Sequence, residues 1–102
     1  MIATEIARII ADFVLFLELD ENQVIDADDA VQIMESLAGR LEALDKGFLR
    51  QLVDAFPVIA EEYGESGDSV RDIAYGFYLE EALAADDPVR LAELDAIRDA
   101  RD

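Results

Sequence analysis

The chain has 102 residues, of which 25 are acidic and 8 are basic, so its formal net charge is −17. Its 53% hydrophobic content separates it from disordered chains, which combine high charge with low hydrophobicity. The length predicts a single domain, residues 1–102, that can bury a core without crosslinks. Such a negative surface should repel nucleic acids and anionic lipids and attract basic proteins or cations.

The chain lacks both cysteine and histidine. This excludes disulfides and thiolate metal sites, and it removes the commonest general base and the most reactive nucleophile. The five glycines are scattered, so no phosphate-binding loop is present. We therefore expect neither an enzyme nor a cofactor. The N-terminal residues do not resemble a signal peptide, and the apolar runs are short, which predicts a cytoplasmic protein without a membrane segment.

The first half of the chain predicts two helices. Apolar residues recur at helical spacing over Thr4–Leu19. The inward positions are expected to be Ile2, Ile6, Ile9, Ile10, Phe13 and Leu17. The run Phe13–Leu17 is apolar on every face, so this end of the helix should be covered on both sides. A second helix should begin after Asp26, whose carboxylate can accept from the N–H of Asp29. It should run to about Leu44, with its inward stripe at Ala27, Ala30, Met34, Leu37, Leu41 and Leu44.

The second half predicts two or three more helices. Asp45 should cap a helix over Lys46–Phe56, and Pro57 should kink or break it. A short continuation should end at Gly64, followed by a loop over Gly64–Asp68. Further helices are expected over Ser69–Leu83 and, after the Asp87–Pro88 start signal, from Pro88 to about Ala100. No segment alternates like a strand, so the predicted fold is an all-α bundle of four to five helices.

The apolar residues of Ser69–Leu83 fall on two separate arcs. One interpretation is a central helix that is covered on both sides. The other is an exposed patch in which Tyr63, Tyr75 or Tyr78 anchors a basic partner, since tyrosine beside acids is typical of protein interfaces.

The segment ELDENQVIDADDAV, residues 18–31, carries six acids and no base. These are Glu18, Asp20, Glu21, Asp26, Asp28 and Asp29. Aligned with a calcium-binding EF-hand or dockerin loop, the segment offers oxygen ligands from Glu18, Asp20, Asn22, Asp26 and Asp29. It departs from that pattern in having Glu at position 1, Gln23 where glycine is usual, and Asp at position 12. The other interpretation is a plain corner between two helices.

The run FLELDENQVIDADDAVQIMESL, residues 16–37, resembles the short acidic helical immunity proteins of bacterial polymorphic and contact-dependent toxin systems. The resemblance is one of length, acidity and helix order, and it covers about the first 45 residues. It implies a cytoplasmic protein that binds one cognate toxin domain and neutralises it. The six corner acids would form the surface that attracts a basic toxin, and the three tyrosines would be weaker candidates for anchors.

Three alternatives remain at this point. The first is a helical domain that binds calcium through the single loop described above. The second is a nucleic-acid mimic that occupies a DNA-binding groove. The third is an adaptor or oligomeric helical domain that uses the second arc of Ser69–Leu83. The oligomeric state is not predicted by the sequence.

Overall fold

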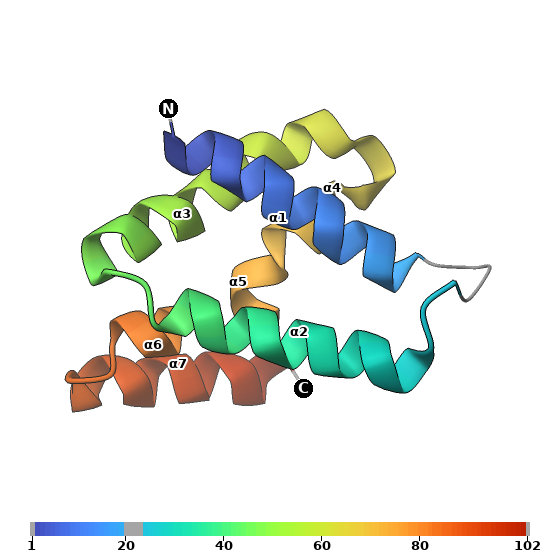
Figure 1. Cartoon of the computed structure of the whole chain (residues 1–102). Coiled ribbons are helices and arrows are strands. Elements are labelled where there is room, and N and C mark those ends of the chain that lie inside the picture. Colours follow the sequence, from blue (N-terminus) through green and yellow to red (C-terminus); the bar gives the residue numbers. More distant parts are fainter. Residues whose placement is uncertain (1, 20–23, 102) are drawn as a thin grey trace.

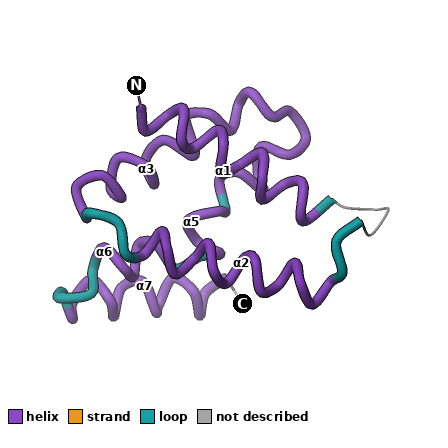
Figure 2. Tube along the Cα trace, viewed as in Figure 1, coloured by secondary structure: helices purple, strands orange, loops and turns teal. Residues whose placement is uncertain are grey.

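The structure is a computed structural model that describes residues 2–19 and 24–101. All regular structure in these residues is helical, which confirms the predicted all-α fold. Four helices have 14 to 17 residues, and short helical segments link the third to the last (Figures 1 and 2). In chain order the elements are α1 (Ile2–Glu18), α2 (Ala27–Glu42), α3 (Lys46–Ile59), the 3₁₀ helix η1 (Ala60–Ser66), α4 (Gly67–Arg71), α5 (Ile73–Gly76), α6 (Leu79–Leu83) and α7 (Pro88–Arg101).

Helix α3 forms the centre of the core. Leu49, Leu52, Phe56 and Ile59 are fully buried along it, and α1 packs against it over much of its length (Figure 1). The chain then continues through η1 and α4, and Val70 of α4 is buried in the same core. Helix α5 leads to α6, which contacts α2, α3 and α7. Burial of these apolar side chains drives the packing, since each contributes about 1.5–3 kcal/mol.

Helix starts are set by local aspartates, as predicted. The carboxylate of Asp45 accepts from the N–H of Phe48 at 3.1 Å, and that of Asp87 accepts from the N–H of Arg90 at 3.1 Å. Asp26 also caps α2, but its carboxylate accepts from the N–H of Asp28 at 3.2 Å and not from Asp29. These side chains satisfy backbone donors that the first turn of a helix leaves free.

Of the two outcomes predicted for Pro57, a kink or a break, the break is wrong, because α3 continues through Pro57 to Ile59. The ring is exposed, and the missing N–H costs one hydrogen bond of the helix. Continuing the helix allows Phe56 and Ile59 to be buried on the same face. The predicted loop over Gly64–Asp68 is also wrong, since the chain forms η1 and then α4 there. Gly64 has φ +54°, a left-handed conformation that glycine adopts without strain.

The predicted helix over Ser69–Leu83 is not continuous. It divides into α4, α5 and α6, with breaks at Asp72 and at Phe77–Tyr78. Tyr78 has φ +58°, which costs an ordinary side chain about 1–2 kcal/mol. The two apolar arcs are therefore not two sides of one straight helix.

The buried face of α1 agrees only in part with the prediction, since Ile10 and Leu17 are buried as expected and Ile2 is exposed. The helix buries Ala3, Ala7, Ile10, Ala11, Val14 and Leu17. Ile9, Phe13 and Phe16 are exposed, so the apolar run Phe13–Leu17 is covered on one side only. Within the described residues, no helix is long and apolar enough to cross a bilayer.

Candidate functional site

Helix α2 buries few of its side chains. Its only buried side chain is Leu41, near its C-terminal end. Met34, Leu37 and Ala38 are half-buried, whereas Ala27, predicted to point inward, is exposed. The predicted inward stripe is therefore only partly covered, and an apolar surface stays open beside it.

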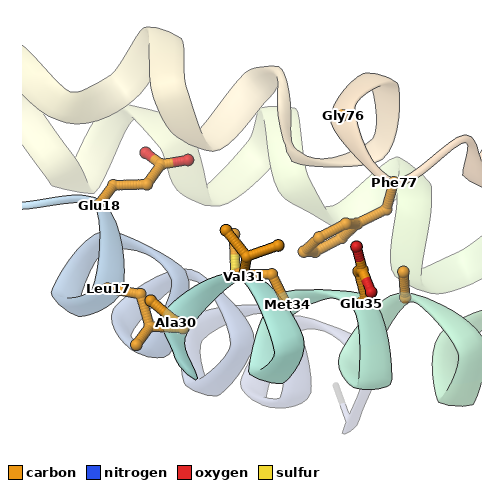
Figure 3. Close-up of a pocket in the computed structure, with 9 residues that line it drawn as sticks. Leu17, Glu18, Ala30, Val31, Met34, Glu35, Gly76 and Phe77 are labelled. Carbon is orange, nitrogen blue, oxygen red and sulfur yellow. The ribbon is translucent and has the colours of Figure 1, made fainter. Parts of the chain in front are cut away.

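This surface forms one wall of a groove with a volume of about 380 Å³. Helix α1 contributes Leu17 and Glu18, and the α5–α6 turn contributes Gly76 and Phe77. The α2 wall is made by Ala30, Val31, Met34, Glu35 and Ala38. Figure 3 shows the Phe77 ring directed toward α2, with Glu18 at the opposite end of the groove. The lining is apolar except for Glu18 and Glu35, both of which are acidic.

A second hollow of about 480 Å³ shares Glu18, Met34 and Phe77 with the groove. At its far side Arg101 donates to Asp72 at 3.3 Å. The Arg101 guanidinium also lies 3.8 Å from the centre of the Tyr75 ring. The charged groups at this end therefore neutralise each other.

The rest of the groove has no such neutralisation. Seven of the eight basic residues form ion pairs, and none of these pairs involves a carboxylate of α2 or Glu18 within the described residues. The paired bases are Arg8, Lys46, Arg50, Arg71, Arg90, Arg98 and Arg101. No basic residue lies between Arg8 and Arg40 in the sequence, so the end of α1 and most of α2 carry acids without a base among them.

Four of the six predicted corner acids lie among the described residues, at the end of α1 and the start of α2. Glu18 ends α1 and lines the groove, whereas Asp26, Asp28 and Asp29 are exposed at the start of α2. The end of α1 and the start of α2 lie at the same end of the molecule (Figure 1). Asp20 and Glu21, also predicted as partner-binding residues, lie outside the described residues.

The predicted tyrosine anchors have internal partners. The Tyr63 hydroxyl lies 2.7 Å from a carboxylate oxygen of Asp12 and 3.3 Å from the carbonyl oxygen of Arg8. Burial, together with the Asp12 carboxylate, raises the pKa of Tyr63 to about 12. Tyr75 and Tyr78 both stack on Arg98, with ring centres 4.0 and 3.7 Å from the guanidinium carbon. Of the three rings, Tyr78 is the most exposed.

The calcium hypothesis depends on residues that lie partly outside the described structure, namely Asp20 and Asn22. Among the described residues, no three acidic side chains come together in a way that could hold a metal ion. The Asp26 carboxylate, a proposed ligand, accepts a hydrogen bond from α2. The calcium loop therefore stays a prediction.

No family model matches the chain, and neither the curated proteins nor the solved structures contain a match. The groove is therefore the feature on which a function can be argued. The sequence contained a signal for part of it, because Ala30 and Met34 belong to the predicted apolar stripe of α2. Phe77 could not be placed there, since its position depends on the turn at Tyr78.

Proposed function

We propose that this protein is an immunity-type inhibitor that binds a basic toxin domain and neutralises it. The observation that supports the proposal is the open apolar groove between α1, α2 and Phe77, with carboxylates as its only charged lining. This combination fits a partner that inserts an apolar side chain and places lysine or arginine beside it.

The groove would supply most of the affinity. Its volume of about 380 Å³ is within the range of pockets that bind small ligands, and it is large enough for one or two apolar side chains. Interfaces commonly depend on a few such anchors in desolvated pockets, each contributing about 2 kcal/mol or more. Val31, Met34 and Phe77 would contact the anchor.

The acidic surface would raise the rate of association with the toxin. An inhibitor must bind a toxin before the toxin acts, and complementary charge can raise association rates to about 10⁸ M⁻¹s⁻¹ or more at low salt. Glu18, Asp26, Asp28 and Asp29 are exposed and form no ion pair within the described residues, so their field extends into solvent. Association should therefore slow steeply with added salt.

The test is whether this protein protects cells that express the product of the gene immediately upstream, which is the candidate toxin. Val31→Glu places a charge in the groove, and Val89→Glu makes the same change on the exposed side of α7. Both valines are largely exposed, at 56% and 71%, so neither change should unfold the protein. We expect wild type and Val89→Glu to protect and Val31→Glu to fail. Equal protection by both variants would place the interface elsewhere, and no protection by wild type would refute the function.

A further inference from the structure

Helix α1 carries a second apolar face, most of which is exposed in the described structure. Ile2, Ile6, Ile9, Phe13 and Phe16 follow one another at steps of four and three residues. Ile2, Ile9, Phe13 and Phe16 are between 40% and 74% exposed, and Ile6 is half-buried. A surface helix normally presents polar residues on its outer face, so this continuous stripe is unusual.

The spacing of this stripe is that of a coiled-coil seam. Steps of four and three over five positions keep the side chains on one line along a helix, ready to insert between side chains of a second helix. The neighbouring line of α1, which includes Ala7, Ile10 and Val14, has the same spacing and is buried against the rest of the core. Helix α1 thus has two adjacent seams, of which one is already occupied.

The charges beside the exposed stripe indicate what would cover it. Glu5 and Asp12 precede Ile6 and Phe13, the positions that flank a coiled-coil seam on one side. The base of this helix, Arg8, is bound to Glu5 and, at 2.9–3.0 Å, to Glu62. A second copy of this chain would bring its own Glu5, Asp12 and a net charge of −17 against them. A helix with lysine or arginine beside its apolar residues would instead complement them.

We infer that the Ile2–Phe16 stripe is a docking seam for a basic amphipathic helix of a partner protein. The stripe lies on a different face of α1 from Glu18 and the groove, so this inference does not rest on the proposed function. A partner could engage both surfaces, but each can be tested alone.

The probe is a synthetic peptide of about four heptads with leucine at the seam positions and lysine at the flanking positions. A control peptide has the same composition with its leucines moved off the seam, which retains the charge attraction and removes the apolar register. Binding to the full chain is measured by titration calorimetry near physiological salt. We expect the peptide with leucine at the seam positions to bind at least tenfold more tightly than the control peptide.

The protein variants locate the contact. A double variant with Ile9→Gln and Phe13→Gln should bind the two peptides equally. A control double variant, Val58→Gln with Val89→Gln, changes exposed valines elsewhere and should keep the tenfold preference for the peptide with leucine at the seam positions. Circular dichroism verifies that both variants stay helical. Equal binding of the two peptides, or a preference that survives in the α1 variant, would overturn the inference. A wild-type dimer that becomes monomeric in the α1 variant would overturn the choice of a basic partner, because the stripe would then pair with itself.

Discussion

Replacing Arg98 with methionine should destabilise the protein more than replacing any other arginine on α7. Its side chain is 14% exposed and pairs with Glu81, which is 21% exposed, through contacts of 2.6 and 3.2 Å. It also donates to the carbonyl oxygen of Tyr75 at 2.7 Å and lies between the rings of Tyr75 and Tyr78. These contacts fasten α7 to the α5–α6 turn, where Tyr78 adopts its left-handed conformation.

The expected loss follows from these contacts. Hydrogen bonds to a charged group contribute about 1.5–3 kcal/mol each, and stacking on aromatic rings contributes about 0.5–2 kcal/mol. The contributions overlap, and methionine recovers some apolar contact, so we expect a loss of about 3 kcal/mol. For a domain of this size each 1 kcal/mol lowers Tm by about 4–8 °C, which gives a decrease of roughly 12–24 °C.

Thermal and urea unfolding followed by circular dichroism would measure this loss. The matched control is Arg90→Met on the same helix, because Arg90 pairs with Glu93 at 3.5 Å on an exposed surface. Such pairs contribute at most about 1 kcal/mol. A loss below about 1 kcal/mol for Arg98→Met, or equal losses for the two variants, would refute the role assigned to Arg98.

The same pair predicts a dependence on pH. The hydrogen bonds from Arg98 lower the pKa of Glu81 below its ordinary value of 4.5. A carboxylate with a lowered pKa in the folded state stabilises the protein above the unfolded pKa and loses this effect as pH falls through the folded pKa. The difference in stability between wild type and Arg98→Met should therefore shrink below about pH 4.5. A difference that is constant from neutral pH to acid would contradict this assignment.

Four further substitutions test other parts of the fold. Asp45→Ala should cost about 1 kcal/mol in urea unfolding, because α3 loses its capping bond of 3.1 Å; an unchanged midpoint would mean that the cap is not needed. Burial raises the pKa of Tyr63 to about 12. The free energy of unfolding that Tyr63 contributes should therefore be fully present below about pH 10 and decrease as pH rises toward 12. Tyr63→Phe should remove the ionisation step at the highest pH in an ultraviolet absorbance titration. A single ionisation step for all tyrosines would contradict it. Gly67→Ala should destabilise the protein by about 1–3 kcal/mol, since the added carbon would lie 2.8 Å from the carbonyl oxygen of Ala60. Gly39→Ala should instead stabilise it by about 0.5–1 kcal/mol, because Gly39 lies in α2 with open space around it.

The helix-capping residues were predicted correctly from the sequence because capping depends only on neighbouring residues. The caps at Asp45 and Asp87 lie where they were expected, because a side-chain acceptor reaches a backbone N–H only two or three residues away. The break at Tyr78 could not be predicted in this way. Its left-handed conformation accompanies stacking on Arg98, which is 20 residues further along the chain.

Part of the buried face of α1 was mispredicted for a related reason. Hydrophobicity alone favours the line that contains Ile9 and Phe13, because these residues are larger and more apolar than alanine. The structure instead buries the line that contains Ala7 and Ala11. Small side chains allow α1 to lie close to α3, so packing depends on shape as well as on hydrophobicity. Of the two acids that line the groove, Glu18 was predicted from the sequence and Glu35 was not, and the groove itself requires the positions of three separate elements.

The sparse packing of α2 has a consequence for how the protein tolerates substitution. Most destabilising substitutions act through buried side chains, and Leu41 is the only buried side chain of α2. Val31 and Glu35 could therefore change while the core formed by α1 and α3 keeps its stability above the threshold for folding. The groove wall could thus diversify at little cost in stability, and a lineage could acquire a new binding preference while its core stays constant.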